Sequence, residues 1–278
     1  NKMANITAAE VNNLRKMTGA GMMDCKKALI ESDGDVEKAI DILRKKGQKI
    51  AAKRADKAAS EGVVLSGTNG TGTFAAVVMI NCETDFVAKN QDFVDFTKSV
   101  LDVAIANEAK NADELNALEL NGRTVADQIS DQMGKIGEQI KLGAYEVLEA
   151  PKAFAYIHQG NKLATILGLN MAEGVDQVGR ELAMQVAAMA PVAVDKDDVA
   201  KSVIDKEMEI GMDQARQEGK PEAMLEKIAT GKVNKFLKDN TLLNQVFVRD
   251  GKKIVRDYLK ETNGDLTVNG FKRVMLGA

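Results

Sequence analysis

The hydrophobic positions of residues 5–47 recur every three to four residues, which predicts three short α-helices. Thr7 and Glu10 have the spacing of a capping box and mark the start of the first helix. The glycine-containing segment 19–21 separates it from a second helix over about residues 22–32. Because so short a segment buries only a small core, we expect a marginally stable three-helix module.

The third helix of this module carries its apolar residues on one face, at Val36, Ala39, Ile40 and Leu43. Gly47 stands where a helix C-cap belongs, so we expect this helix to end there. A separate charged, alanine-rich helix is predicted to run on to about Ala59 and to link the module to the rest of the chain.

The segment after this linker has the pattern of a β-hairpin followed by helices. Two predicted strands, 62–66 and 73–80, flank a turn rich in glycine, threonine and asparagine. The second strand is apolar on both faces, as a buried central strand would be. A helix follows whose apolar positions are Phe93, Phe96, Val100, Leu101 and Ala104. We expect another helix over about residues 125–142.

A second group of strands and a helix repeats this arrangement. Residues 144–149, 153–158 and 163–170 are predicted strands, and a helix through 179–190 ends at Pro191. Strands followed by an apolar helix, twice, predict an α+β fold with a two-lobed core.

Residues 195–239 are more highly charged and predict two helices with narrow apolar stripes, broken at Gly219 and Pro221. Such helices form an antiparallel hairpin, which either packs on its own protein or protrudes towards a partner. The tail adds a predicted helix at 252–260 and an edge strand at 267–276.

These elements divide the chain into four expected parts. They are an N-terminal three-helix docking module with its linker at 3–58, a first core lobe at 59–142, a second core lobe at 143–194 and 240–278, and a helical hairpin (coiled-coil) insertion at 195–239. The hairpin therefore interrupts the second lobe.

Composition excludes several kinds of active site. The chain has one histidine, His158, so it lacks the residues for a two-histidine metal site. Its two cysteines are too far apart for a CxxC motif. No P-loop occurs, and no nucleophile elbow accompanies His158, whose position in a strand is typical of a structural histidine. Carboxylate pairs for general acid–base chemistry stay open, because none of the 41 acidic residues is marked out. We expect no metal and no cofactor.

The longest unbroken hydrophobic run has seven residues, whereas a membrane-spanning helix needs about 18. Together with the scattered cysteines, this favours a cytoplasmic chain with no membrane partner. Residues 1–58 carry 13 Lys or Arg against 8 Asp or Glu, a basic excess that would suit nucleic acid or an acidic protein. No aromatic side chains interleave with these charges, so a stacking platform for single-stranded nucleic acid is absent. A solvated linker helix that ends in basic residues is the favoured interpretation, with a nucleic-acid-binding adaptor as the alternative, and we expect no direct nucleic-acid contact.

Two segments combine apolar side chains with tight turns. Met22 and Met23 follow a glycine turn and adjoin two lysines, which suits protein docking, but filling the module's core is an equally good interpretation. Phe86 follows Asp85 where a buried strand gives way to a helix. It either projects as an apolar wedge beside a charge or packs inward behind a helix N-cap, and the pattern alone slightly favours the second.

Both segments resemble the signatures of the bacterial elongation factor Ts family. One is L-R-x-x-T-G-A-G-M-M-D-C-K-K-A-L over 14–29, and the other is N-C-x-T-D-F-V-A over 81–88. The resemblance continues through 156–158 and the charged hairpin to 263–271, so it covers nearly the whole chain. It implies an N-terminal module like a ubiquitin-associated domain, a two-lobed α+β core and a helical hairpin inserted in the second lobe.

The resemblance also implies guanine nucleotide exchange on elongation factor Tu, without bond chemistry of the chain's own. It assigns the wedge that disturbs the partner's magnesium site to Thr84, Asp85, Phe86 and Val87. It assigns further partner contacts to Arg15, Met22, Met23, Lys26, Arg54, Ile136, Gly137 and His158. The hairpin leaves open whether the chain forms a homodimer, a 2:2 complex or a 1:1 complex with elongation factor Tu.

Overall fold

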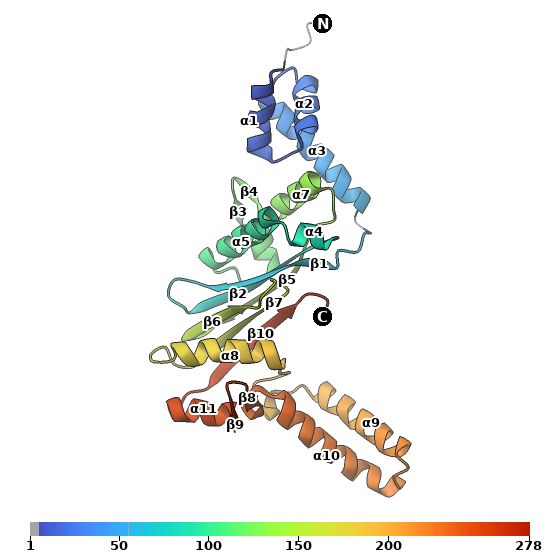
Figure 1. The fold of residues 1–278 in the computed structure, drawn as a ribbon, viewed down its shortest axis with the longest axis vertical. Coiled ribbons are helices and arrows are strands. Elements are labelled where there is room, and N and C mark those ends of the chain that lie inside the picture. Colours follow the sequence, from blue (N-terminus) through green and yellow to red (C-terminus); the bar gives the residue numbers. More distant parts are fainter. Residues whose placement is uncertain (1–5, 55) are drawn as a thin grey trace. The chain divides into compact units, whose positions relative to one another are not determined.

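The computed structural model describes residues 6–54 and 56–278 and has the α+β composition that the sequence predicts. Its contacts divide the chain into two compact units. The first unit comprises the residues up to Leu65, Val78–Tyr145 and Met275–Ala278, and the second comprises Ser66–Val77 and Glu146–Val274. Figure 1 shows the helices and strands of both units along the chain.

The N-terminal segment forms three helices, as the sequence predicts: α1 (Ala8–Thr18), α2 (Met22–Glu31) and α3 (Val36–Arg54). The expected capping box is present, because the Thr7 N–H donates to the Glu10 carboxylate at 2.7 Å and the Glu10 N–H donates to the Thr7 hydroxyl at 3.3 Å. Gly19 ends α1 in the left-handed conformation that glycine adopts without strain. The buried core of this module is small: Val11, Leu14, Cys25, Ala28, Leu29 and Ala39.

Helix α3 continues through Gly47 to Arg54, so the expected helix end at Gly47 is wrong and no separate linker helix follows in residues 56–59. Gly47 is buried because it faces Gly134 of helix α7 (Val125–Ile136). A Cβ at Gly134 would lie 2.7 Å from the Gly47 Cα, which is closer than real Cβ atoms approach. The two glycines therefore let the backbones of α3 and α7 come into contact where the helices cross.

The first sheet has the strand order β1-β2-β5, with β1 (Glu61–Thr68), β2 (Phe74–Cys82) and β5 (Lys141–Glu149). Strand β2 is central and almost entirely buried, as its apolar pattern predicts. The predicted apolar face of helix α5 (Gln91–Ala106) is buried as well. The smaller elements before α7 are α4 (Asp85–Ala88), α6 (Ala112–Ala117), β3 (Glu119–Leu120) and β4 (Arg123–Thr124).

Helix α7 ends at Ile136, six residues before the predicted end near residue 142. Gly137 terminates it in a left-handed conformation with φ of 81°, and its N–H donates to the Met133 carbonyl at 2.8 Å. A short loop, residues 137–140, then leads into β5. This loop places Glu138 directly after the helix C-cap.

The second sheet has the order β10-β7-β6, with β6 (Lys152–Ile157), β7 (Leu163–Leu169) and β10 (Val268–Met275). Strands β6 and β7 are antiparallel, and the tail strand β10 lies at the sheet edge, as predicted. Helix α8 (Asp176–Met189) packs on β6 and β7. A Cβ at Gly179 would lie 2.1 Å from the Phe154 ring, so a glycine is needed where α8 meets β6.

The segment between α8 and β10 is mostly helical: η1 (Lys196–Asp198), α9 (Lys201–Gln217), α10 (Glu222–Asn240), η2 (Leu242–Asn244), β8 (Val246–Phe247), β9 (Asp250–Ile254) and α11 (Val255–Thr262). Helices α9 and α10 pack side by side (Figure 1), through Gly211, Ala215, Leu225, Ala229 and Val233. The tail helix begins at Val255 and not at 252 as predicted, because the preceding residues form β9 and pair with β8.

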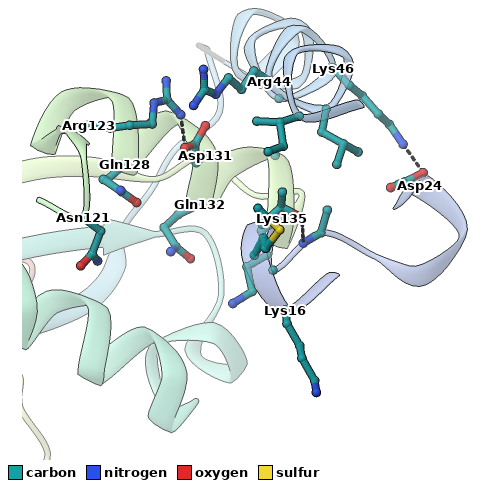
Figure 2. A pocket seen from close by; sticks show the side chains of 18 of the residues that line it. Lys16, Asp24, Arg44, Lys46, Asn121, Arg123, Gln128, Asp131, Gln132 and Lys135 are labelled. Atoms are coloured by element: carbon teal, nitrogen blue, oxygen red, sulfur yellow. Dashed lines mark hydrogen bonds and ion pairs between the residues drawn. The ribbon is translucent and has the colours of Figure 1, made fainter. Parts of the chain in front are cut away.

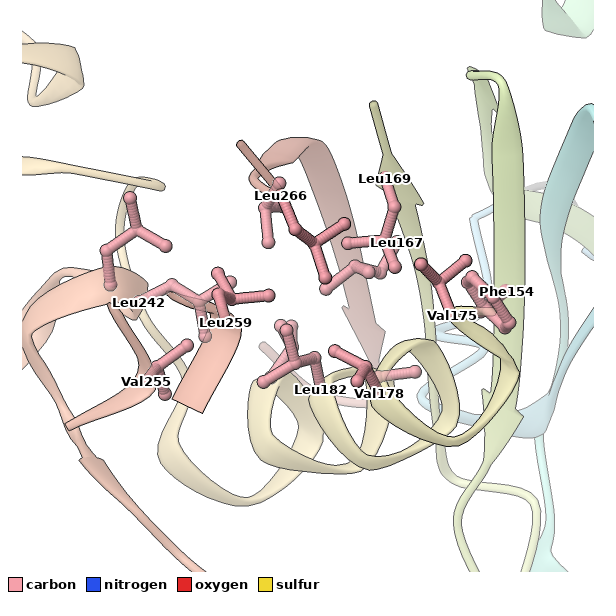
Figure 3. Close-up of a cluster of buried hydrophobic side chains, with 14 of the residues drawn as sticks. Phe154, Leu167, Leu169, Val175, Val178, Leu182, Leu242, Val255, Leu259 and Leu266 are labelled. Atoms are coloured by element: carbon pink, nitrogen blue, oxygen red, sulfur yellow. The ribbon is translucent and has the colours of Figure 1, made fainter. Parts of the chain in front are cut away.

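The core of the second unit gathers apolar side chains from strands and helices that are distant in sequence. Figure 3 shows Leu167 of β7, Leu182 of α8 and Leu259 of α11 directed into one cluster. At its edge, the rings of Phe247 and Tyr258 stack with their centroids 4.2 Å apart. The C-terminal elements are therefore held to α8 and the sheet by apolar burial.

The contact between α3 and α7 makes a prediction about stability. We expect Gly134→Ala to lower the free energy of unfolding by about 1–2 kcal/mol, because the new Cβ meets the Gly47 backbone and cannot be relieved by a side-chain rotation. Denaturant unfolding measures this change.

Gly231→Ala is the matched control. Gly231 lies within α10, and a Cβ there meets nothing within 4 Å. Helix propensity alone should then stabilise the protein by about 0.5–1 kcal/mol. An equal response of the two variants would contradict the proposed close contact between α3 and α7.

Candidate functional site

The chain turns from β2 into the one-turn helix α4 at residues 81–88, which we call the β2–α4 corner. Thr84 is the N-cap of α4, and its hydroxyl oxygen accepts a hydrogen bond from the Val87 N–H at 3.4 Å. Cys82 and Ala88 are buried, whereas 83% of Phe86 is exposed. The interpretation in which Phe86 packs inward is therefore wrong, and an aromatic side chain projects from the fold at this corner.

Cys82 supports the corner from the inside. Its thiol donates a hydrogen bond to the Thr84 carbonyl at 3.2 Å. Burial raises the pKa of the Cys82 thiol to about 12, and the negative charge of Glu138 adds to this rise. The thiol is therefore protonated at neutral pH and remains a hydrogen-bond donor.

Two carboxylates connect the corner to the loop after α7. The Glu138 carboxylate accepts hydrogen bonds from the Glu83 N–H at 3.0 Å, the Thr84 N–H at 3.1 Å and the Thr84 hydroxyl at 2.7 Å. In the opposite direction, the Glu83 carboxylate accepts from the Gln139 N–H at 2.6 Å and from the Arg54 guanidinium at 2.7 Å. We call this set of hydrogen bonds the Glu83–Glu138 lock.

The donors around Glu83 also determine its protonation. The backbone N–H of Gln139 and the guanidinium of Arg54 hold the pKa of the Glu83 carboxyl below its usual value. Charge-assisted hydrogen bonds of this kind are shorter and stronger than neutral ones. The Glu83 carboxylate is therefore ionised at neutral pH.

The charge beside Phe86 is balanced on the outer surface of the corner. The Lys89 ammonium donates to the Asp85 carboxylate at 2.7 Å, and this partner holds the pKa of Lys89 above its usual value. Both side chains are largely exposed, so the pair contributes little to folding. Its presence means that Asp85 is already paired within the chain.

The N-terminal module presents a second exposed apolar surface. The exposed fractions are 51% for Met22 and 62% for Met23, so the interpretation in which they fill the core is wrong. Arg15 of α1 and Lys26 of α2 are also exposed. Adaptable methionine side chains beside basic residues form a surface suited to binding another protein.

A cleft of about 470 Å³ lies between this module and α7. Figure 2 shows two ion pairs on its walls, Lys46 with Asp24 and Arg123 with Asp131. The basic segment 44–57 is partly neutralised in the same way, since Arg54 pairs with Glu83. These pairs reduce the free positive charge that the sequence offers to nucleic acid.

His158 lies in the second unit, just after β6, and its side chain is exposed. The Tyr156 hydroxyl and His158 Nδ1 are 3.0 Å apart and form a hydrogen bond. This bond orients the exposed ring. The histidine is therefore not a core residue.

Comparison with known proteins decides the family. Residues 83–278 match the family described as Elongation factor TS. The chain is 50% identical over 276 residues to elongation factor Ts of Christiangramia forsetii, covering 99% of this chain and 100% of the relative. It is 51% identical over 277 residues to that of Cytophaga hutchinsonii, covering 99% and 100%. The chain belongs to the elongation factor Ts family.

The relative from Amoebophilus asiaticus, also an elongation factor Ts, is 50% identical over 275 residues, covering 98% of this chain and 99% of the relative. This chain is thus a bacterial-type translation elongation factor. In the residues that the structure describes, no helix is both long and apolar enough to cross a membrane. The same residues contain no cluster of three or more His, Cys, Asp or Glu side chains suited to hold a metal ion.

The structure brings together several of the positions that the elongation factor Ts resemblance assigns. Thr84–Val87, the Ile136–Gly137 end of α7 and Arg54 all adjoin the Glu83–Glu138 lock. Arg15, Met22, Met23 and Lys26 form a separate group on α1 and α2. His158 is in the other unit.

Sequence reasoning missed the residues that hold the corner in place. Glu83 occupies the variable position of the N-C-x-T-D-F-V-A signature, and Glu138 directly follows the assigned Ile136–Gly137 pair. Their hydrogen bonds join residues 54 to 56 positions apart. An acidic residue beside each assigned segment was the only signal available, and acidic residues are too common in this chain to be informative.

The lowered pKa of Glu83 predicts how stability changes with pH. Its folded-state pKa is below the ordinary 4.5, so its stabilising contribution is present above about pH 4.5 and is lost as pH falls through the folded value. We expect wild type to be more stable than Glu83→Gln at neutral pH, with a difference that shrinks in acid. Thermal unfolding from pH 3 to pH 7 measures it.

Glu119→Gln provides the control for this pH series, because Glu119 is an exposed glutamate on β3 of the same unit. Its difference from wild type should stay small at every pH. A Glu83→Gln difference that does not change between pH 3 and pH 7 would show that the Glu83 charge contributes nothing to the folded state.

Proposed function

We propose that this chain is the guanine nucleotide exchange factor of elongation factor Tu, and that Phe86 is the wedge that opens the partner's nucleotide site. Family membership supports the partner. The observation that carries the proposal is the 83% exposure of Phe86 on a short helix held by the hydrogen bonds of the Glu83–Glu138 lock. A large apolar side chain held in water gains free energy when it is buried in a partner.

The exchange itself requires no bond chemistry and no cofactor in this chain. An exchange factor must bind the nucleotide-free partner more tightly than the nucleotide-bound partner, and this coupling is reciprocal. Magnesium demands near-octahedral geometry, so a small displacement of the groups around it is costly. Phe86, with Thr84, Asp85 and Val87, would cause that displacement when the corner enters the partner's G domain.

Docking contacts distributed over both units would hold the partner while the wedge acts. The exposed Met22 and Met23, with Arg15 and Lys26, form the N-terminal docking surface. Ile136, Gly137 and Arg54 lie next to the corner, and His158 provides a contact from the second unit. Binding energy gained at these positions offsets the cost of distorting the partner's nucleotide site.

The domain roles follow the same proposal. Residues 3–58 serve as a docking module like a ubiquitin-associated domain, 59–142 as the lobe that carries the wedge, and 143–194 with 240–278 as the second lobe. Residues 195–239, which contain α9 and all but the last residue of α10, serve as the helical hairpin insertion. Light scattering of the complex distinguishes a 1:1 assembly from a 2:2 assembly through this hairpin. Exchange during translation elongation places the chain in the cytoplasm.

Substitution of the wedge tests this function. We expect Phe86→Ala to slow release of labelled GDP from elongation factor Tu by about 10- to 100-fold relative to wild type, since burial of a large apolar side chain gives about 1.5–3 kcal/mol. Stopped-flow fluorescence at saturating exchange factor measures the release rate. The exposed side chain makes few internal contacts, so the melting temperature should not change.

Val192→Ala is the matched control, because Val192 is a half-exposed apolar residue of the second unit. It should release GDP at the wild-type rate. Full activity of Phe86→Ala would refute the wedge, and wild-type protein that leaves GDP release unchanged would refute the exchange function.

A further inference from the structure

The projection of Phe86 raises the question of what orients it. Helix α4 has only four residues, and so short a helix has no stability of its own in water. Phe86 is also too exposed for packing to fix its position. Its orientation must therefore come from the backbone of the β2–α4 corner.

Glu138 accepts hydrogen bonds from the backbone N–H groups of the corner that have no acceptor within β2 or α4. The N–H groups of Glu83 and Thr84 lie after the end of the strand and before the first helical turn, and both donate to Glu138 Oε2. The Thr84 hydroxyl donates to Glu138 Oε1, which leaves the hydroxyl oxygen free to accept the Val87 N–H as the helix cap. One carboxylate thus holds both the entry to α4 and the cap of α4.

The hydrogen bonds to the Glu83 carboxylate keep the corner from rotating about the Glu138 side chain. Glu83 reaches back to the Gln139 N–H, and Arg54 from the end of α3 holds the same carboxylate. Residues 83–84 and 138–139 are therefore joined in both directions. The Gly137 cap of α7 directly precedes Glu138, so the corner is fixed relative to the end of a long helix.

We propose that Glu138 is a positioning residue for Phe86: its carboxylate holds the β2–α4 corner in the orientation that the wedge needs. This inference rests on the proposed exchange function for its kinetic consequence, but not for its structural one. Loss of Glu138 leaves the corner's N–H groups to water and lets α4 fray. The maximal rate of nucleotide release falls, while affinity for the partner is largely retained through Met22, Met23 and His158.

The first test needs no partner. The chain has three tyrosines but no tryptophan, so Phe86→Trp introduces a single tryptophan at the wedge whose fluorescence can be excited selectively. We expect Glu138→Ala in this background to increase the amplitude of the subnanosecond anisotropy decay about twofold, because the ring is no longer held by its backbone. Glu119→Ala, the exposed glutamate on β3, should leave the decay unchanged. An unchanged decay in Glu138→Ala overturns the proposal.

The second test is a double-mutant cycle on GDP release at saturating exchange factor. We expect Glu138→Ala to slow release about 10-fold in the wild-type background and to have almost no further effect in the Phe86→Ala background. Equal slowing in both backgrounds would mean that Glu138 acts on the fold or on another contact, and it would overturn the proposal. Circular dichroism checks that each variant is folded.

Glu138→Gln separates hydrogen bonding from mere packing. Its amide oxygen can still accept the two backbone N–H groups, whereas its amide nitrogen cannot accept the Thr84 hydroxyl proton. We expect a release rate between those of wild type and Glu138→Ala, with the affinity for elongation factor Tu changed less than twofold in both variants. A release rate for Glu138→Gln as low as that of Glu138→Ala would contradict the role of side chain 138 as the acceptor of the two backbone N–H groups.

The outcomes distinguish the two proposals. If wild-type protein fails to accelerate GDP release, the exchange function fails, and the anisotropy experiment still decides whether Glu138 orients residue 86. If wild type is active and Glu138→Ala changes neither the anisotropy decay nor the GDP release rate, only the positioning role of Glu138 fails.

Discussion

Reciprocal hydrogen bonding between two carboxylates and two short backbone segments determines the candidate site. Glu138 accepts from the backbone at residues 83 and 84, and Glu83 accepts from the backbone at residue 139. Buried or half-buried backbone N–H groups are costly to leave without a partner, so a corner between a strand and a one-turn helix needs acceptors from elsewhere in the chain. Once these acceptors are supplied, the corner can expose Phe86 without collapsing onto the core.

Helix α7 connects this lock to the N-terminal module. Near one end Gly134 lets α3 approach until the backbones touch, and after Gly137 the chain presents Glu138 to the corner. Helix α3, packed on the same helix, ends in Arg54, which completes the lock on Glu83. The exposed methionines of α2 and the exposed Phe86 are therefore supported by one set of contacts within the first unit.

Local sequence pattern was sufficient wherever one element decides its own structure. The capping box at Thr7, the buried central strand β2 and the apolar face of α5 were all predicted correctly. The prediction of a helix end at Gly47 is wrong because a glycine that terminates a helix and a glycine that admits another helix are identical in sequence. The inward packing of Phe86 failed for a similar reason, since Cys82 and Ala88 already occupy the buried positions of the corner. Glu138 could not be found at all, because its partners are more than 50 residues away.

The proposed exchange mechanism uses binding energy alone, and no reacting group of the chain is needed for it. Lowering the barrier to nucleotide release by about 4 kcal/mol accelerates release about a thousandfold, which one buried aromatic ring and distributed docking contacts can supply. The most direct measurement is the release of fluorescent GDP from elongation factor Tu after addition of a catalytic amount of this chain. We expect release to accelerate by about a thousandfold over the spontaneous rate, with each molecule of the chain acting on many partner molecules. Release at the spontaneous rate, with the chain folded and present in the same catalytic amount, would contradict the exchange function.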